Sequence, residues 1–430
     1  MPKRPEPRAT KAGRATVIAV LALLTSGALA ACGSDSDNNG GTPSSGGTSA
    51  PKGDIVIGTI QPLTGPFKFY SDWAVPAVDA AVKKVNASGG INGRKVKLVE
   101  ADGDCTSGAK GVAAAREVIN QKHAIALAST QCGVVVSAYN DTILKGTKVI
   151  NFSATGSGAN SSPDATDPAK VGYSFYYSPN TATQSVDLLT WAYGDGNLHP
   201  KKLGVLAGTD NYGSDALKGV NAYVKANNLP APVVQKIDQT ATDASVQVAK
   251  LKAAGVDTIV CGCYPPPTTA LLRGALQSNW HPTVLGALAS SGRAVFQALP
   301  PAAYKNFYGT TTLFDVQDSP AIQAKLKEYQ KYDPKLTIDG VPFIAEAEIL
   351  FEYLKRAGKD LTPDSLVNAL YTGPVDNWVL GPTEIKKGAY PQVVSGVTML
   401  KYEQNGEDVR QVKVGRVTPQ ISIPGIYNAQ

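Results

Sequence analysis

Aromatic, hydroxyl and glycine residues recur where predicted strands of this chain end. The four places are Thr64-Gly65-Pro66 with Tyr70, residues 129–133, residues 153–156, and Asn211-Tyr212-Gly213 with Tyr264. Open parallel sheets bind ligands in the crevice beyond the carboxyl ends of their strands. Free N–H groups at a helix start bind a carboxylate there without a charged side chain, and tyrosine covers an apolar group while keeping a polar tip. Although each residue alone is typical of an ordinary loop, their joint placement predicts a binding crevice.

Motifs of the common enzyme classes are absent from the sequence. There is no GxSxG, no HExxH, and no GxGxxG after the first predicted strand. Residues 208–213 have the glycine spacing of a phosphate loop but lack the lysine that would follow. Asp102 and Asp104 are better interpreted as a solvated turn, because no third ligand lies in step with them. We therefore expect no enzyme, no cofactor and no metal site.

The N-terminal region is typical of a secretory signal. Five basic residues come first, the apolar stretch 15–24 follows, and Leu29-Ala30-Ala31-Cys32 ends the region. The cysteine after Leu-Ala-Ala resembles a bacterial lipobox, which implies that 1–31 is a signal peptide and that Cys32 is the lipidated first mature residue. The alternative is an uncleaved transmembrane anchor, but the apolar run is short for a span of about 20 residues.

Residues 32–53 contain the lipidated cysteine and a glycine- and serine-rich stretch, which predicts a flexible tether. Without residues 1–31 the chain has 36 basic and 34 acidic residues, a net charge of +2 instead of +6. No basic stripe is left, so we expect no nucleic-acid partner. The chain is expected to be anchored by lipid on the extracytoplasmic face of the cell membrane.

From Asp54 onward, short apolar runs alternate with stretches that have helical spacing. Such alternation indicates βαβ units and parallel sheets, and a second series that begins near residue 180 predicts two α/β lobes. The expected strands are 55–60, 95–99, 124–128, 148–152, 202–207, 233–237, 258–261 and 283–285. The expected helices are 72–87, 109–120, 181–193, 214–227, 244–254, 267–278, 319–332, 341–357 and 363–370. An alternating tail, 394–413, is expected to be extended.

Four stretches of the sequence carry a family resemblance. They are Ile57-Gly-Thr-Ile-Gln-Pro-Leu-Thr-Gly-Pro66, Val85-Asn-Ala-Ser-Gly-Gly-Ile-Asn-Gly93, Val149-Ile-Asn-Phe-Ser-Ala-Thr155 and Asp210-Asn-Tyr-Gly213. The chain resembles the branched-chain amino-acid-binding proteins of ABC importers, the Leu/Ile/Val type of periplasmic binding protein. The likeness covers most of residues 54–415 and is most specific in the N-terminal block.

This resemblance implies the α/β type I periplasmic-binding-protein fold, with two doubly wound parallel-sheet lobes joined by three crossovers. We expect one lobe to contain 54–178 and 312–385, and the other to contain 179–311 and 386–430. The ligand is expected between the lobes. The implied ligand-binding residues are Tyr70, Thr130, Gln131, Cys132, Ser153, Ala154, Thr155, Tyr212 and Tyr264.

The family also implies a disulfide near the cleft, which would join Cys105 to Cys132. Four cysteines remain after Cys32, and an even number of cysteines in an exported chain is typical of disulfide bonding. No such support exists for a bond between Cys261 and Cys263, where the ring would be tight and strained, and that pair is left open.

One position departs from the family. Its amino-acid binders carry a carboxylate after the strand equivalent to 283–285, and the corresponding residue here is Leu288. An unpaired buried ammonium costs several kcal/mol, so an α-amino acid requires a substitute such as Asp210 or Asp104. A branched-chain or other amino acid remains the first choice of ligand, and amides, urea and aromatic carboxylates are the alternatives.

The leading hypothesis is a lipid-anchored, monomeric solute-binding protein that delivers its small-molecule ligand to an ABC permease. A ligand sensor of the same fold is the second hypothesis. An exported enzyme is the third, and it lacks a clustered nucleophile and base.

Overall fold

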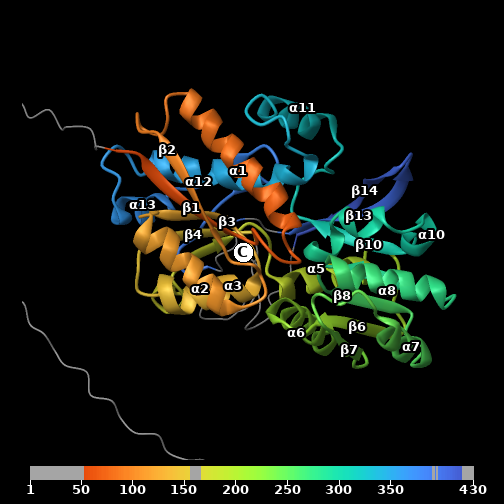
Figure 1. Cartoon of the computed structure of the whole chain (residues 1–430). Coiled ribbons are helices and arrows are strands. Elements are labelled where there is room, and N and C mark those ends of the chain that lie inside the picture. Colours follow the sequence, from red (N-terminus) through yellow and green to blue (C-terminus); the bar gives the residue numbers. More distant parts are fainter. Residues whose placement is uncertain (1–52, 155–165, 390–392, 394–395, 419–430) are drawn as a thin grey trace, which may run out of the picture. The chain divides into compact units, whose positions relative to one another are not determined.

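The computed structural model describes residues 53–154, 166–389, 393 and 396–418 of the chain (Figure 1). Its contacts group Ala50–Gln430 into one compact unit. Several predictions fall outside the described residues. They concern the signal peptide, Cys32, nearly all of the tether, and Thr155. The described residues contain most of both predicted lobes.

Within the described residues, the first sheet has five parallel strands in the order β2-β1-β3-β4-β5. Its strands are β1 (Ile55–Gln61), β2 (Val96–Asp102), β3 (Ala126–Thr130), β4 (Ile150–Ser153) and β5 (Tyr173–Tyr176). Because these strands are rich in apolar residues and are covered by helices, β3 and β4 are buried along their whole length. The apolar runs of the sequence thus predicted four of the five strands, whereas β5 was missed.

The second sheet, in the same described part of the chain, has seven strands in the order β14-β13-β10-β9-β8-β6-β7. The parallel strands are β6 (Leu203–Gly208), β7 (Val233–Ile237), β8 (Thr258–Gly262), β9 (Thr283–Gly286) and β10 (Phe307–Thr311). The hairpin β13 (Val397–Asn405) and β14 (Asp408–Val417) adds two antiparallel strands beside β10. The extended tail expected from the sequence is therefore part of this sheet. A small antiparallel pair, β11 (Val375–Asn377) and β12 (Gly381–Thr383), stands apart from both sheets.

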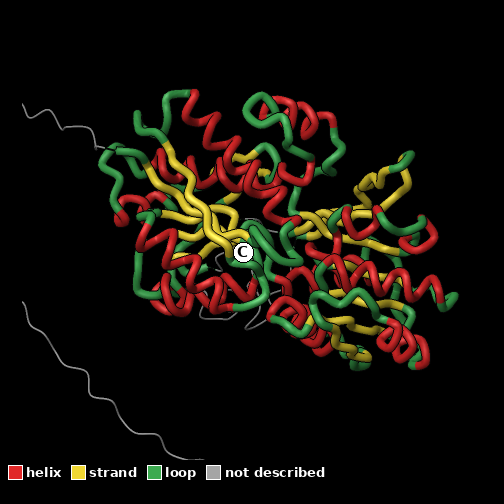
Figure 2. The backbone as a smooth tube through the Cα atoms, in the orientation of Figure 1, coloured by secondary structure: helices red, strands yellow, loops and turns green. Residues whose placement is uncertain are grey.

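Helices flank the strands of both sheets, as Figure 2 shows. Those between strands of the first sheet are α1 (Phe69–Ala87), α2 (Gly108–Arg116), α3 (Gly133–Tyr139) and α4 (Pro168–Val171). Those before or between strands of the second are α5 (Thr181–Tyr193), α6 (Asn211–Ala226), α7 (Ser245–Ala253), α8 (Pro265–Gln277), α9 (Ala294–Gln297) and α10 (Pro301–Tyr304). The later helices are α11 (Pro320–Tyr329), α12 (Val341–Arg356) and α13 (Pro363–Ala369).

Over its described length, the chain passes between the two lobes three times. It leaves the first sheet after β5 and builds the second sheet from β6 to β10. It then returns, because α12 packs on α1 and on β3 of the first sheet. The hairpin β13–β14 finally joins the second sheet. These passages are the three crossovers that were expected.

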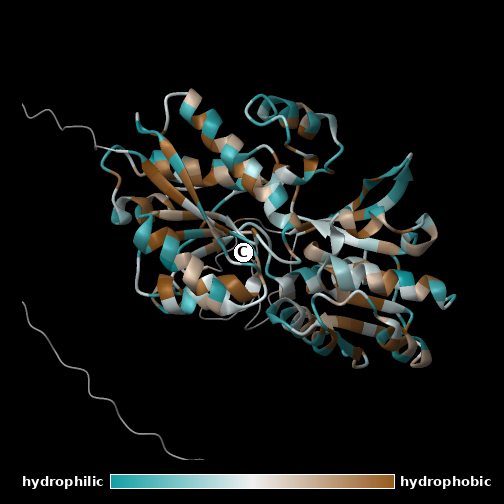
Figure 3. Ribbon diagram, viewed as in Figure 1, coloured by the Kyte–Doolittle hydropathy of each residue, from teal (hydrophilic) through white to brown (hydrophobic). Residues whose placement is uncertain are grey.

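Hydrophobic residues fill the space between sheets and helices, and Figure 3 colours much of the strands as hydrophobic. One cluster joins β1, β3 and β4 to α1 and α12, and another lies within the second lobe around Phe296 and Phe307. A third cluster contains residues of both lobes. Phe67 and Tyr264 belong to that third cluster, with ring centroids 5.2 Å apart.

Candidate functional site

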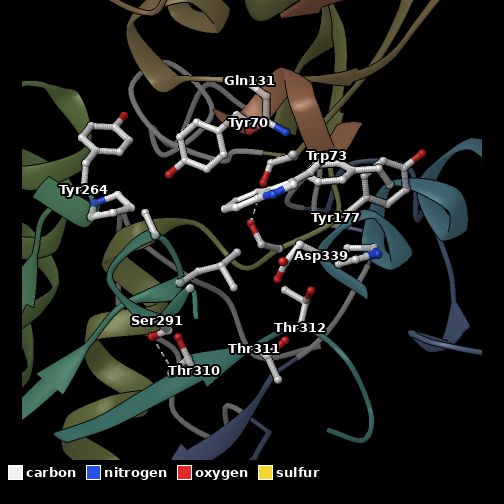
Figure 4. A pocket seen from close by; sticks show the side chains of 18 of the residues that line it. Tyr70, Trp73, Gln131, Tyr177, Tyr264, Ser291, Thr310, Thr311, Thr312 and Asp339 are labelled. Carbon is white, nitrogen blue, oxygen red and sulfur yellow. Dashed lines mark hydrogen bonds between the residues drawn. The ribbon is translucent and has the colours of Figure 1, made fainter. Parts of the chain in front are cut away.

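A cavity of about 170 Å³ lies between the two lobes. Its wall is formed beyond the carboxyl ends of β3 and β4 in the first lobe and of β8, β9 and β10 in the second. This is where an open parallel sheet binds ligands. Figure 4 shows Tyr70, Trp73 and Gln131 across the cavity from Ser291 and Thr310.

The first lobe contributes α1 and the loop after β3. Tyr70 and Trp73 lie three residues apart near the start of α1, so they share one face of that helix. Gln131 and Cys132 follow β3 directly. A disulfide joins Cys132 to Cys105, with the two Cα atoms 5.5 Å apart, and so ties the loop after β2 to the loop after β3.

The second lobe contributes two tyrosines at helix starts. Tyr212 lies in the first turn of α6, Tyr264 directly precedes α8, and their rings stack with centroids 5.3 Å apart. The Tyr212 hydroxyl accepts a hydrogen bond from the Ala289 N–H (2.9 Å). Burial raises the pKa of Tyr212 and Tyr264 well above the usual value, so both hydroxyls are neutral.

The loop after β9 contains no carboxylate. The backbone N–H of Leu288 donates to Oε1 of Gln184 (2.8 Å), and Leu288 and Ala289 both line the cavity. Neither substitute considered from the sequence lines it. Asp104 pairs with Lys110, and Asp210 caps α6 by accepting from the Gly213 N–H (3.1 Å).

Nine residues were predicted to bind the ligand. Six of them line the cavity: Tyr70, Gln131, Cys132, Ala154, Tyr212 and Tyr264. Thr130 and Ser153 are completely buried beneath the wall. The Thr130 hydroxyl contacts the Tyr139 hydroxyl (2.7 Å), and the Ser153 hydroxyl donates to the carbonyl oxygen of Thr130 (3.1 Å). Thr155 lies outside the described residues.

Cys261 and Cys263 are two separate buried thiols in the structure. Sγ of Cys263 donates to the carbonyl oxygen of Leu206 (3.2 Å), and Sγ of Cys261 lies 3.5 Å from the Thr268 hydroxyl. This arrangement answers the question that the sequence left open, because the pair is not bonded here.

A polar part of the wall was not found from the sequence. It consists of Gln317, Asp339, Glu346 and Gln411, with the aromatic residues Trp73, Tyr177 and Phe343 beside it. Asp339, Phe343 and Glu346 recur at helical spacing, which was the one available signal. That signal becomes informative only when the fold brings the start of α12 to the cleft.

Of the two carboxyl groups in this polar part, that of Glu346 belongs to a buried residue and that of Asp339 to a half-buried one. Burial raises the pKa of Glu346 to about 8, and the Ser129 hydroxyl opposes that rise. Burial also raises the pKa of Asp339, and the charge of Arg293 opposes it. Arg293 itself pairs with Asp318 (3.0 Å) and Asp408 (2.5 Å).

Among the residues that the structure describes, no three His, Cys, Asp or Glu side chains gather as ligands of a metal ion would. Across the same ranges, every helix is too short or too polar to cross a membrane.

Comparison with known proteins gives a consistent answer. A family model described as periplasmic binding protein matches residues 54–407. The Leu/Ile/Val-binding protein homolog 3 of Brucella melitensis is 26% identical over 334 residues, which cover 76% of this chain and 85% of that protein. The Leu/Ile/Val-binding protein of Escherichia coli K12 is 25% identical over 236 residues, or 54% of this chain and 61% of that one.

Solved structures match the fold over most of the chain. A fatty acid ABC transporter substrate-binding protein from Thermomonospora curvata superposes with a TM-score of 0.75 at 21% identity, covering 87% of this chain and 96% of that one. A solute-binding protein from R. palustris in complex with 4-hydroxybenzoate gives 0.72 at 17% identity, covering 86% and 98%. These likenesses confirm the fold class predicted from the sequence.

Proposed function

The chain belongs to the periplasmic binding protein family, and from this premise we propose that it is the solute-binding protein of an ABC importer. It captures a small polar solute outside the cytoplasmic membrane and delivers it to the permease. The observation that carries the proposal is the cavity between the lobes, which is lined by tyrosines and polar groups from both. Concave, largely apolar sites with a few placed polar groups are typical of small-molecule binding.

Closure of the lobes around the solute gives the mechanism. With the lobes closed, water is excluded and each hydrogen bond to the solute gains strength. The solute is not transformed, and the closed form is the one that docks on the permease. We assign 54–178 with 312–385 to one lobe and 179–311 with 386–430 to the other, and we expect a monomer.

We further propose that lipid on Cys32 anchors the protein to the extracytoplasmic face of the cell membrane. In a bacterial host, the wild-type chain is expected in the membrane fraction and labelled by a fatty-acid probe. Cys32→Ser removes the acceptor thiol, so label and membrane association are both expected to disappear. A Cys32→Ser protein that still carries the label would refute the anchor.

The solute is proposed to be a branched-chain or other amino acid. Relatives named for leucine, isoleucine and valine binding support this choice. The R. palustris structure in complex with 4-hydroxybenzoate supports aromatic carboxylates as one alternative. Amides and urea are further alternatives, which the family resemblance of the sequence implies.

A thermal-shift screen on residues 33–430, stripped of bound solute by unfolding and refolding, tests the proposal. The panel contains branched and polar amino acids, short amides, urea and aromatic carboxylates. A ligand present at 1,000 times its Kd stabilises the protein by about 4 kcal/mol, which moves Tm by several degrees. A shift with at least one small solute is expected, and no shift across the panel counts against a binding function.

A further inference from the structure

Three buried acceptor atoms in the wall of the cleft have no hydrogen-bond partner among the described residues. They are Oε1 of Gln317, Oε1 of Gln411 and Oε2 of Glu346. Their residues are 8%, 7% and 5% exposed, and all three line the cavity. A buried polar atom without a hydrogen-bond partner destabilises the folded protein. This part of the wall therefore offers acceptors that a bound solute can satisfy with its own donors.

The charge of the wall has one sign. Asp339 adds a second carboxyl group to that of Glu346, and no lysine, arginine or histidine occurs among the described residues that line the cavity. Arg293 is close enough to influence Asp339 but is engaged by Asp318 and Asp408. A protonated nitrogen placed here would favour the ionised forms of Asp339 and Glu346 and could donate to the unpaired acceptors, whereas a solute with only a carboxylate would meet no positive charge.

Aromatic rings border the same region. Trp73, Tyr177 and Phe343 line the same cavity as Asp339 and Glu346, and Figure 4 labels Trp73, Tyr177 and Asp339 in its wall. The faces of such rings attract cations, and Trp attracts them most strongly. Carboxyl groups and aromatic rings in the wall of one cavity suit an organic cation better than an anion or a neutral polyol.

We infer that the solute of this cleft carries a protonated nitrogen, which seats against Glu346 and Asp339 with Gln317 and Gln411 as acceptors. The inference rests on the proposed solute-binding function and narrows it. It also accounts for Leu288, because the carboxylates come from the start of α12 and the segment before it instead of from the loop after β9. Glu346 and Asp339 are thereby residues that determine specificity.

Matched solutes test this inference. Leucine is compared with 4-methylpentanoate, which lacks its amine, and with 3-methylbutylamine, which lacks its carboxylate. A second set contains larger solutes: phenylalanine, 3-phenylpropanoate and 2-phenylethylamine. Affinities are measured by titration calorimetry on the full-length mature chain. The amine-bearing members of at least one set are expected to bind at least tenfold more tightly than the deaminated acid.

Variants on one helix separate charge from folding. Glu346→Gln keeps the shape of the side chain. We expect it to lower the affinity for the amine-bearing solutes at least tenfold and to leave the affinity for the deaminated acids unchanged. Glu352→Gln is the control, because Glu352 is also on α12 but is a surface residue paired with Lys355 and Arg356. Asp339→Asn provides a second test should Glu346→Gln fail to fold.

The outcomes distinguish failure of this inference from failure of the proposed solute-binding function. Preferential binding of fatty acids, benzoates or the deaminated acids would overturn the inference and leave the solute-binding function standing. Equal affinity in Glu346→Gln, Asp339→Asn and wild type would overturn it as well. If no member of either set and no member of the wider panel bound, the proposed function itself would fail.

Discussion

Tyr70 and Tyr264 approach the cleft from different lobes, and each brings a ring together with a neutral hydroxyl. Burial followed by the charge of Asp210 raises the pKa of both tyrosines above the usual value. A neutral phenol can donate a hydrogen bond while its ring covers an apolar group. These two side chains are therefore expected to contribute affinity from both sides of the solute.

The double variant Tyr70→Ala/Tyr264→Ala is expected to lose at least tenfold in affinity, because each truncation removes roughly 1 kcal/mol or more of ring contact. Titration calorimetry with the tightest solute of the panel measures the effect. Tyr264→Phe retains the ring and removes the hydroxyl, so it separates the contribution of the ring to affinity from that of the hydroxyl. Unchanged affinity in the double variant would remove both residues from the site.

Glu346 makes the stability of the empty protein depend on pH. Glutamate in an unfolded chain titrates near about 4.3, whereas burial raises the pKa of Glu346 to about 8 in the folded protein. Between those values the folded state binds more protons, so the free energy of unfolding falls as pH rises. The stability that Glu346 contributes is therefore complete below its pKa in the unfolded chain. It is lost as pH rises through its pKa in the folded protein.

Groups that face Glu346 from neighbouring elements do not reverse this fall of stability with rising pH. The Ser129 hydroxyl comes from β3, and the Tyr177 hydroxyl, after β5, donates to the backbone carbonyl of Glu346. Asp339, before α12, carries the same kind of charge and also has a raised pKa. None of these three can become a cation.

Urea unfolding of wild type and Glu346→Gln at pH 5 and pH 8 checks the effect. Wild type is expected to lose more stability across this interval than the variant, by about 1 kcal/mol or more, since one proton contributes up to about 1.4 kcal/mol per pH unit. Parallel losses in the two proteins would show that Glu346 does not titrate in this range.

Among the elements, the disulfide between Cys105 and Cys132 holds two loops at the edge of the cleft. It closes a loop with a sequence separation of 27 residues, for which the loss of chain entropy in the unfolded state predicts about 3.5 kcal/mol of stability. Cys132 also adjoins Gln131 in the wall. Stability and the shape of the site therefore depend on one bond.

Replacing both Cys105 and Cys132 with serine is expected to lower the free energy of unfolding by about 2–4 kcal/mol. Urea titrations of wild type with and without reductant provide the comparison, and reduced wild type should match the variant. Mapping of free thiols by mass spectrometry gives a direct check. Alkylation of both cysteines in the native, oxidised protein would contradict the bond.

Periodicity explains which elements the sequence could predict. The helix expected at 181–193 has those bounds as α5, because its apolar residues keep a helical period up to Gly194. Thr130 and Ser153 were placed correctly at strand ends, but their orientation was not predictable. The register of β3 shifts between Leu127 and Thr130, and Ser129 has a φ of 53°, which interrupts the alternation of faces.

The polar part of the cleft was unpredictable for a different reason. Gln317 and Glu346 follow the last parallel strand, and Gln411 lies in the terminal hairpin. Their place at the cleft depends on the second and third passages of the chain between the lobes. Local patterns determine helices and strands, whereas contacts between segments hundreds of residues apart determine this part of the site.

For the molecule as a whole, solute affinity includes the cost of bringing the lobes together. Phe67 contacts Tyr264 across the lobes, and Nδ2 of Asn211 on α6 reaches the Ser137 hydroxyl on α3 (3.5 Å). Opening the cleft would break both contacts. A protein whose binding-competent state is only partly populated has its apparent affinity reduced by that fraction.

Phe67→Leu should therefore weaken solute binding even though Phe67 is outside the wall of the cavity. Loss of the ring pair costs about 1 kcal/mol of closure, or roughly a fivefold change in Kd. Phe296→Leu serves as the control, since Phe296 is buried in a ring cluster inside the second lobe. That control should lower stability but not affinity.

Calorimetry on these two variants is combined with small-angle scattering with and without solute. In wild type the radius of gyration should fall when solute binds, and in Phe67→Leu a higher solute concentration should be needed for the same fall. Equal affinities in Phe67→Leu and wild type would mean that this contact does not stabilise the closed form. The energy of closure would then have to come from the solute and the groups that line the cleft.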